Sequence, residues 1–265
     1  MTRLAVQSVL VPGATLREKH DNALAYGFDG LELNHFPMID AAREAVRERV
    51  PVTAMCSGHR GWFIDPDPDE IRACITDVKR LLELGADLDA PLIVVPIYGR
   101  TNKLPNCGTG RSPEDDEALW LDGLREVTAH AEKVGGRLVV EGINRYENSV
   151  SVTVADAVRW AREARSPNVK AMGDVFHMNI EEPDMGAALE AAGDMLAYVH
   201  LGDSHRLEPG TGHLDFANVF AALHRIGYEG WASMECNLSG DAADVLPRSA
   251  AFVRDQIERA ASRPG

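Results

Sequence analysis

The chain has 265 residues, of which 45 % are hydrophobic, 6 % aromatic and 26 % charged. This apolar content excludes an intrinsically disordered chain, because enough apolar surface is available to offset the entropy of ordering. The formal net charge is −14, from 27 Lys and Arg against 41 Asp and Glu. Such a protein is repelled by phosphate backbones and the sequence holds no Lys/Arg cluster, so no nucleic-acid partner is expected.

The chain contains no stretch approaching the ~18 consecutive apolar residues that a membrane helix needs. The apolar run Leu4–Leu10 is too short and too polar for a secretory signal. We therefore expect a cytoplasmic protein with no membrane partner. The cysteines are widely spaced and form no CxxC pair, which is typical of reduced, mostly buried thiols: Cys56, Cys74, Cys107 and Cys236.

Short apolar runs recur along the whole chain at intervals of roughly 30 residues. Several are apolar at consecutive positions, such as Leu92–Val95 and Leu138–Val140. This pattern favours parallel strands that are buried on both faces. The predicted strands are Leu4–Val11, Gly30–Leu33, Val52–Cys56, Leu92–Ile97, Arg137–Glu141, Val169–Asp174, Leu196–His200 and Trp231–Glu235.

Helical patterns fill the segments between these strands. Asp67–Glu70 forms a capping box with proline at the first helical position, and Gly85 is expected to close that helix. Ser112 is expected to open the next helix and Gly135 to end it. The other predicted helices are Leu16–Tyr26, Val154–Ala164, Met185–Ala192, Phe216–Ile226 and Ala243–Ala261.

This alternation predicts an α/β protein with a single (β/α)8 TIM barrel formed by residues 1–265. A doubly wound open sheet is the alternative architecture. Such a sheet usually carries a glycine-rich phosphate turn after its first strand, and Val11–Ala14 does not fit that pattern.

The last four predicted strands each end on a potential metal ligand: Glu141, Asp174, His200 and Glu235. In a barrel the carboxyl ends of neighbouring strands meet at one mouth, so four such residues in succession indicate a shared centre. Three carboxylates and one imidazole suit octahedral Mn²⁺, Mg²⁺ or Co²⁺, with two positions left for water or substrate oxygens. We expect one divalent metal per chain, and not structural zinc, which would favour cysteines.

A second set of polar residues follows these strand ends and is expected to bind a polyhydroxylated ligand at the same mouth: Asn144, Arg145, Glu147, His177, Asp203, His205 and Arg206. Because Arg206 is the only strong cation near the Pro209–His213 segment, an unphosphorylated substrate is favoured. Two other motifs are interpreted as structural. Asp65–Glu70 imitates the start of a calcium loop but has glutamate where glycine is needed, and Pro209–His213 resembles a phosphate cradle but fits a tight loop better.

The chain resembles the sugar isomerase/epimerase superfamily of xylose-isomerase-like barrels, and most closely the D-tagatose 3-epimerase or ketose 3-epimerase group. The resemblance is carried by Val140–Glu147, Gly173–Glu182, His200–Arg206 and Ser233–Glu235, which lie in the second half of the barrel. The first half fits only by fold pattern. Gly142 departs from the bulkier aliphatic residue expected there, and the segment Asp203-Ser204-His205 departs from the usual epimerase loop.

The resemblance implies that Glu141, Asp174, His200 and Glu235 hold the metal and that Glu141 and Glu235 are the catalytic acid/base pair. It also places Glu147, His177 and Arg206 on substrate oxygens. It further implies an isomerase of carbohydrate metabolism, with Mn²⁺ favoured over Mg²⁺ or Co²⁺, that assembles as a homodimer or homotetramer.

The expected reaction is C3 epimerisation of a free ketose through a metal-stabilised enediolate, with the two glutamates on opposite faces of the substrate carbon. Protonation at the adjacent carbon would instead give an aldose–ketose or hydroxypyruvate isomerase, and the sequence does not separate these outcomes. An inosose dehydratase, with His205 or His213 as proton donor, and a C-glycoside deglycosidase subunit with a partner chain also remain open. The net charge and the small number of histidines disfavour an endonuclease IV-like enzyme. The two glutamates disfavour a non-catalytic sugar-binding barrel.

Overall fold

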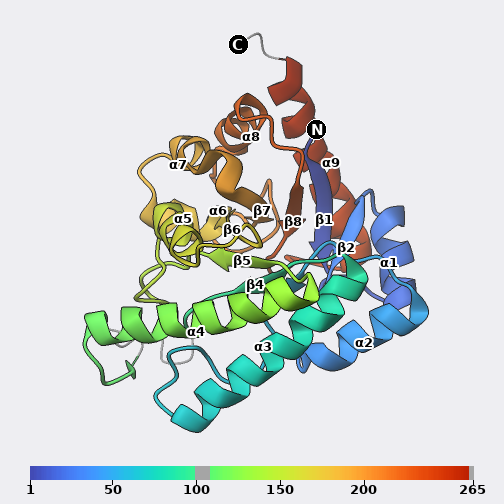
Figure 1. The fold of residues 1–265 in the computed structure, drawn as a ribbon. Helices are drawn as coiled ribbons and strands as arrows, with labels where there is room; N and C mark the ends of the chain where they lie inside the picture. The colour runs from blue at the N-terminus through green and yellow to red at the C-terminus, as the bar shows by residue number, and fades with distance from the viewer. Residues whose placement is uncertain (99–107, 263–265) are drawn as a thin grey trace.

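Eight parallel strands curve around a common axis, with the helices packed outside them (Figure 1). The computed structural model describes residues 1–98 and 108–262. The strands pair in the order β2-β1-β8-β7-β6-β5-β4-β3, every pair is parallel, and an isolated parallel bridge between Leu33 and Met55 joins the two outer strands. The predicted (β/α)8 barrel is therefore confirmed. The strands are β1 Arg3–Gln7, β2 Gly30–Glu32, β3 Met55–Cys56, β4 Leu92–Val94, β5 Leu138–Glu141, β6 Val169–Asp174, β7 Leu196–Leu201 and β8 Trp231–Met234.

The helices follow the strands in the expected alternation. Among the described residues they are α1 Leu16–Ala25, α2 Met38–Glu48, α3 Pro68–Leu88, α4 Pro113–Val134, α5 Val154–Glu163, α6 Val175–Glu181, α7 Met185–Ala192, α8 Phe216–Arg225 and α9 Ala242–Ser262. The predicted caps at Asp67 and Ser112 are confirmed, since each side chain accepts a hydrogen bond from a first-turn backbone N–H.

Two helices were not predicted, and each lacks an ordinary start signal. Helix α2 begins after Pro37, which makes no side-chain capping bond. Helix α6 begins directly after β6, and its N-cap is Asp174, a residue predicted from the sequence to bind the metal. A helix without a separate Ser, Thr, Asp or Asn before it offers little for sequence analysis to detect.

Several predicted boundaries were wrong. Strand β1 ends at Gln7 and β4 at Val94, before the predicted ends, and β3 is reduced to two residues. Helix α3 continues through Gly85 to Leu88. A Cβ on Gly85 would lie 2.7 Å from the carbonyl oxygen of Ala90, so this glycine permits a close backbone approach and does not end the helix.

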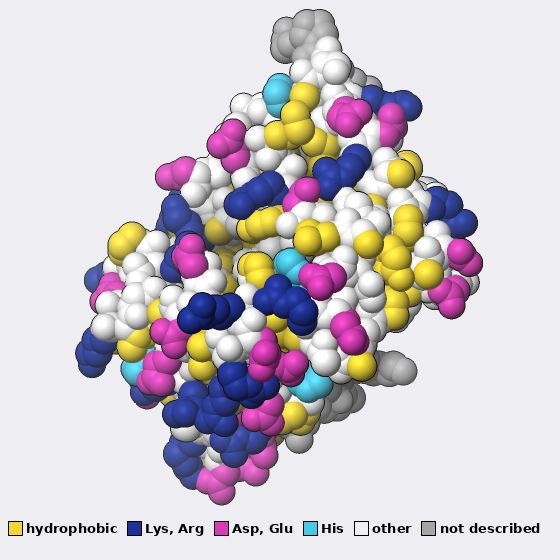
Figure 2. Space-filling model, turned by 90° about the vertical axis from the view of Figure 1, so that its right-hand side faces the viewer, with side chains coloured by type: hydrophobic (Ala, Val, Ile, Leu, Met, Phe, Trp, Pro, Cys, Tyr) yellow, Lys and Arg dark blue, Asp and Glu magenta, His cyan; other side chains and the backbone are white. Residues whose placement is uncertain are grey.

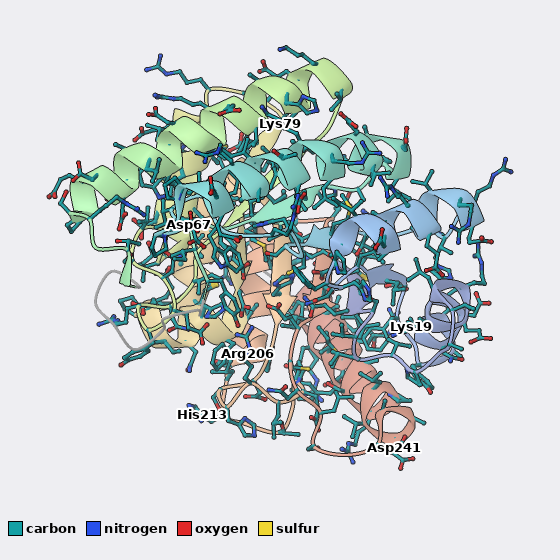
Figure 3. All side chains as sticks on the ribbon, turned by 90° about the horizontal axis from the view of Figure 1, so that it is seen from below. Lys19, Asp67, Lys79, Arg206, His213 and Asp241 are labelled. Carbon is teal, nitrogen blue, oxygen red and sulfur yellow. The ribbon has the colours of Figure 1, made fainter. Side chains whose placement is uncertain are left out.

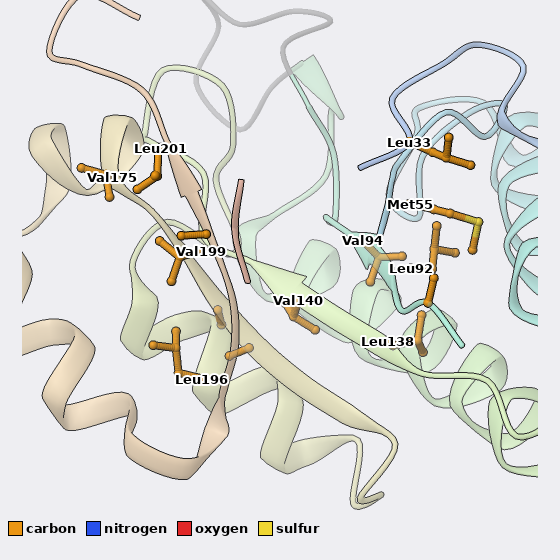
Figure 4. Packing of buried hydrophobic residues seen from close by; sticks show 14 of the residues in the cluster. Leu33, Met55, Leu92, Val94, Leu138, Val140, Val175, Leu196, Val199 and Leu201 are labelled. Carbon is orange, nitrogen blue, oxygen red and sulfur yellow. The ribbon is translucent and has the colours of Figure 1, made fainter. Parts of the chain in front are cut away.

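The apolar core has two parts because successive side chains of a strand point to opposite faces. The larger part lies between the strands and the helices and includes Leu92, Val94, Leu138 and Val140 (Figure 4). The smaller part lies within the ring of strands: Ala54, Cys56, Ile93, Val139, Met172 and Tyr198. The barrel interior is therefore filled at its centre, and any site must lie toward one end.

In the described part of the chain, no helix has the length and apolar character needed to span a membrane. On the face shown in Figure 2, basic side chains lie with acidic ones beside them. Cys56, Cys74 and Cys236 are free thiols, as predicted, and Cys107 lies outside the described residues.

Candidate metal centre and active site

Strand periodicity directs the four predicted ligands into the barrel. Val139, Met172 and Tyr198 belong to the interior core. The residues two positions further along the same strands, Glu141, Asp174 and His200, therefore point to the same side, at the carboxyl ends. Glu235 follows β8 directly, two residues after the buried Ser233. Backbone register helps, since Asp174 and His200 are direct partners across β6 and β7.

The four side chains converge on one centre. One ligand atom from each of Glu141, Asp174, His200 and Glu235 can be chosen so that all four lie within 4.8 Å of one another. Nδ1 of His200 lies 3.1 Å from Oε2 of Glu235, 3.6 Å from Oε1 of Glu141 and 4.0 Å from Oδ2 of Asp174. The predicted grouping of these residues is thus present in the structure.

Three of these atoms are buried without a hydrogen-bond partner among the described residues: Oε1 of Glu141, Oδ2 of Asp174 and Nδ1 of His200. Unsatisfied buried polar atoms cost free energy, and carboxylates held together repel one another. A divalent cation would satisfy both requirements at once, and oxygen and imidazole donors suit Mn²⁺, Mg²⁺ or Co²⁺. The residues present therefore fit a bound divalent metal.

The electrostatics of these side chains reflect this crowding. Burial raises the pKa of Glu141, and it raises the pKa of Asp174 to about 6. Burial would also raise the pKa of Glu235, but His200 and Arg206 together hold it well below its ordinary value. The three carboxylates are thus not equivalent. Arg206 pairs directly with Glu235 at 3.3 Å, whereas at Asp174 burial outweighs the effect of the same guanidinium.

Gly142, the departure noted in the sequence, has a steric explanation. A Cβ at this position would lie 2.5 Å from the carbonyl oxygen of Thr153, the residue that caps α5. The hydroxyl of Ser151 donates to the carbonyl oxygen of Glu141 at 2.9 Å. The loop after β5 therefore folds back tightly against the strand end that carries Glu141, and an aliphatic side chain at position 142 would not fit.

A cavity of about 280 Å³ opens above the centre. Glu141 and Glu235 line it together with His177 and Arg206. Its other wall comes from the end of β3 and the loops after β2, β3 and β4 and was not predicted: Asn34, His35, Phe36, Cys56, Ser57, Gly58, Trp62, Val95 and Tyr98.

Arg206 and His177 lie side by side in this cavity. Nη1 of Arg206 is 3.2 Å from Nε2 of His177, and Nη2 donates to Oε2 of Glu235 at 3.3 Å. The guanidinium also lies over the ring of Phe176, 4.6 Å from its centroid. Nδ1 of His177 lies 2.7 Å from the amide nitrogen of Asn144, and burial lowers the pKa of His177 to about 4, so this imidazole is neutral at neutral pH.

Arg206 is held in place by a loop organised around the buried carboxylate of Asp203. Its backbone is in the left-handed region (φ 59°), within a turn in which the N–H of Asp203 donates to the carbonyl oxygen of Leu207 and the N–H of Arg206 donates to that of Asp203. The carboxylate of Asp203 accepts hydrogen bonds from the backbone N–H groups of Ser204, Gly210, Thr211 and Leu214. The Pro209–His213 motif is therefore a tight loop organised by an internal carboxylate, as predicted.

The other predicted polar residues do not line the cavity. Arg145 pairs with Glu181 at 2.6 Å and is exposed. His205 is exposed, and His213 contacts Ser204 on the outer part of its loop, beyond Arg206 (Figure 3). Glu147 is half-buried with one buried oxygen, Oε2, that has no partner in the described structure, but it is not part of the cavity wall.

Sequence analysis also missed Gln7 on β1 and Glu32 on β2, two buried residues that contact the ligand candidates Glu235 and His200. Glu32 lies within a correctly predicted strand, Gly30–Leu33. The signal that could have identified it was an acid inside an otherwise apolar strand. The alternation of side chains along that strand directs this acid to the inward face.

Comparison with known proteins places the chain among sugar epimerases. A family model described as "Xylose isomerase-like TIM barrel" matches residues 21–256. The chain is 34 % identical to 3-dehydro-D-guloside 4-epimerase of Escherichia coli over 86 % of this chain and 90 % of that protein. It is 33 % identical to ketose 3-epimerase of Arthrobacter globiformis over 86 % of this chain and 87 % of that protein.

Solved structures give the same result. The crystal structure of 3-keto-D-glucoside 4-epimerase from Escherichia coli superposes with a TM-score of 0.88 at 31 % identity, over 96 % of this chain and all of that one. A structure of L-ribulose 3-epimerase gives 0.83 at 25 % identity, over 98 % and 96 %. The protein is an enzyme of the isomerase class, of the epimerase type that these relatives represent, and it belongs to the xylose isomerase-like TIM barrel family.

Proposed function

We propose that this protein is a divalent-metal-dependent epimerase that inverts C3 of an unphosphorylated ketose. The observation that carries the proposal is the convergence of Glu141, Asp174, His200 and Glu235, three of them with an unsatisfied buried atom, at the floor of a cavity lined by Arg206 and His177. Arg206 is the one Lys or Arg among the described residues that line that cavity, and it is already paired with Glu235. A substrate phosphate would have to compete for it, which favours a neutral sugar.

Glu141, Asp174, His200 and Glu235 would hold the metal. When bound, a divalent cation supplies Lewis acidity that stabilises negative charge on substrate oxygens. We favour Mn²⁺, with Mg²⁺ or Co²⁺ as alternatives, because the donor set is rich in oxygen.

The proton transfers belong to the two glutamates. One carboxylate takes the proton from C3, and the C–H electron pair moves toward the neighbouring carbonyl oxygen to give an enediolate. The other glutamate, as a carboxylic acid, returns a proton to the opposite face of C3, and the carbonyl reforms. The reverse reaction exchanges the two roles. Glu141 and Glu235 come from β5 and from the end of β8, which lie three strands apart around the barrel.

Arg206, His177 and Glu147 would bind substrate hydroxyl and carbonyl oxygens. The neutral imidazole of His177 can donate to or accept from a hydroxyl group, whereas the guanidinium of Arg206 donates only. Glu147 would have to turn toward the cavity to take part. Its Oε2 has no partner among residues 1–98 and 108–262 and could accept a hydrogen bond from the substrate.

A second candidate is epimerisation at C4 of a 3-keto glycoside, the chemistry named for the Escherichia coli relatives. The same proton transfers apply, because C4 of such a sugar also adjoins a carbonyl. The observation in its favour is the aromatic character of the wall that comes from the first half of the barrel, which includes Phe36, Trp62 and Tyr98. Phe36 is 67 % exposed. The ring of a free monosaccharide would leave this large apolar surface uncovered.

The test is isotope incorporation during turnover in D₂O. Metal-loaded protein is incubated with a panel of ketoses and with methyl 3-keto-glucoside, and early products are separated and analysed by mass spectrometry and NMR. The proposal expects deuterium at C3 of the epimeric ketose while unreacted substrate stays protiated, because each face exchanges with its own base. Label at C1 would identify an aldose–ketose isomerase, and turnover of the glycoside alone would favour the second candidate.

Substitution of the two glutamates tests the acid/base pair. Glu141→Gln and Glu235→Gln should each abolish epimerisation while keeping the side-chain volume. Metal content is measured alongside by elemental analysis, because both residues also belong to the proposed ligand set. A Glu235→Gln protein that retained its metal and turned over ketose at the wild-type rate would contradict the two-base mechanism.

A further inference from the structure

Glu32 is a fully buried carboxylate that lies outside the proposed ligand set. It ends β2, and its register partner on β1 is Gln7. Its oxygens contact three donors: Nε2 of His200 at 3.0 and 3.2 Å, Nε2 of Gln7 at 3.2 Å, and the hydroxyl of Tyr198 at 3.2 Å. The Tyr198 hydroxyl in turn lies 2.7 Å from that of Thr53. Glu32 is therefore satisfied within the protein.

The contact with Glu32 determines which way the imidazole of His200 faces. Glu32 has only acceptor atoms when ionised, so Nε2 of His200 carries the proton that it donates to that carboxylate. The other nitrogen, Nδ1, then faces Glu141, Asp174 and Glu235 on the opposite side of the ring. Metal-binding histidines are oriented in this way by carboxylates behind them.

Gln7 orients the side chain of Glu235, as Glu32 orients that of His200. Its Nε2 donates to Oε1 of Glu235 at 3.0 Å as well as to Glu32, and its Oε1 accepts from Nδ2 of Asn34 at 2.9 Å. The amide of Asn34 thus fixes the orientation of the Gln7 amide, with the NH₂ group toward two carboxylates. With Oε1 of Glu235 held, Oε2 is the oxygen that faces His200.

We infer that Glu32 and Gln7 are positioning residues, which hold His200 and Glu235 from behind so that Nδ1 and Oε2 face the metal centre. The inference rests on the proposed function, because it assigns these residues to the centre proposed above. Both residues come from the half of the barrel that supplies none of the proposed ligands, and one amide group joins the two supports.

A second metal site built from Glu32, Cys56 and His200 is the competing interpretation, since their donor atoms also lie close together. The hydrogen bonds argue against it. Glu32 already has a donor on each oxygen, and Nε2 of His200 is one of those donors. Burial and the neighbouring carboxylates raise the pKa of Cys56 well above its ordinary value, which keeps it a thiol 3.8 Å from Glu235.

The inference is tested by titrating Co²⁺ into metal-free protein by calorimetry and recording the visible absorption of the loaded form. Glu32→Gln should weaken Co²⁺ binding by about 10–100-fold, the usual effect of losing a carboxylate behind a histidine ligand, and should change the Co²⁺ spectrum. The control is Asp77→Asn. Asp77 lies on α3, and its buried carboxylate pairs with Arg60 at 2.7 Å. This variant should lower the melting temperature while leaving Co²⁺ affinity and spectrum unchanged.

Gln7→Met supplies a second, independent measurement, because it keeps the side-chain length and removes both donors. It should weaken Co²⁺ binding by about tenfold, and the double variant with Glu32→Gln should lose less than the product of the two single effects, since both act on Oε1 of Glu32. If Glu32→Gln does not fold, Tyr198→Phe replaces it, with an expected loss of about fivefold, on the scale of one hydrogen bond.

Wild-type Co²⁺ affinity and spectrum in both Glu32→Gln and Gln7→Met would overturn the inference. A second Co²⁺ bound per wild-type chain and lost in Glu32→Gln would overturn it in favour of the second site. Metal titration needs no substrate, so the two proposals fail separately. Protein that shows the expected metal losses but epimerises no sugar contradicts the proposed function alone.

Discussion

Oδ1 of Asp174 accepts hydrogen bonds from the backbone N–H groups of Phe176, at 2.7 Å, and His177, at 3.2 Å, while Oδ2 of the same carboxylate has no partner in the described structure. One oxygen therefore caps helix α6, which carries His177 into the cavity, and the other faces the proposed metal. The position of a substrate-binding candidate is tied to a metal-ligand candidate by a helix cap.

This division of one carboxylate gives opposite expectations for two variants. Asp174→Asn keeps an acceptor for the cap but loses the charge of a ligand candidate. Metal affinity should therefore fall by more than the roughly 10–100-fold expected when a residue behind a ligand is mutated. The metal-free variant should be at least as stable as wild type, because burial raises the pKa of Asp174 and its ionised form is unfavourable at neutral pH. Asp174→Ala, which also loses the cap, should be less stable than Asp174→Asn by about 1 kcal/mol. Urea unfolding of the metal-free proteins measures both.

Metal binding should stabilise the fold by linkage. At a free metal concentration of 100 times its dissociation constant, the free energy of unfolding should rise by about 2.7 kcal/mol. Removal of metal by EDTA should lower the melting temperature and abolish turnover, and Mn²⁺, Co²⁺ or Mg²⁺ should restore both, with close to one ion per chain by elemental analysis. Full activity in excess chelator, from protein without divalent metal, would contradict the metal-dependent mechanism.

Arg206 and His177 are expected to act on the substrate without holding the metal. Arg206→Ala and His177→Ala should each lower kcat/KM. The loss should correspond to roughly 1–3 kcal/mol of transition-state stabilisation, the scale of a hydrogen bond to a buried partner. Metal content should stay at the wild-type level in both. His205→Ala, an exposed residue of the same loop, is the matched control and should leave kinetics unchanged. Loss of metal from either cavity variant would place that residue among the ligands.

The carboxylate of Asp203 should make the loop that carries Arg206 sensitive to acid. Burial would raise its pKa, but hydrogen bonds from four backbone N–H groups outweigh that effect and the pKa is lowered. A lowered folded-state pKa contributes stability above the unfolded value, ~3.9, that is lost as the pH falls through the folded value. Asp203→Asn should therefore cost about 1–3 kcal/mol at neutral pH, with the difference constant above about pH 5 and shrinking below about pH 4.

Urea unfolding of metal-free wild type and Asp203→Asn across pH 3–7 tests this expectation. Asp194→Asn, at an exposed position, is the control and should leave stability unchanged at every pH. A difference that grew as the pH fell would show that the sign of the Asp203 effect is wrong.

The grouping of the four ligand candidates could be predicted because strand ends are visible in the sequence and barrel geometry brings them together. Glu141 and Asp174 end their strands as expected, His200 precedes the last residue of β7, and Glu235 follows β8. A displacement of one residue did not matter, since the side chain keeps its inward direction through the strand period.

The opposite wall could not be predicted, because its residues share no periodic pattern. Trp62 and Tyr98 lie in loops, and their approach to the cavity depends on how those loops fold. Glu32 is different, since its strand was predicted and its inward direction followed from the register. It was missed because only strand ends were considered, and the parity of a charged residue inside a strand was not.

The cavity is built from two halves with separate duties: the ligand candidates come from β5 to β8, and most of the facing wall comes from the loops after β2, β3 and β4. Laboratory evolution can exploit this separation. A mutant library confined to positions such as His35, Phe36 and Trp62 would alter which sugar is accepted while leaving the ligand set untouched. Gln7 and Glu32 would have to stay fixed in such a library. They contact Glu235 and His200, so substituting them would disturb ligand candidates in the second half of the barrel.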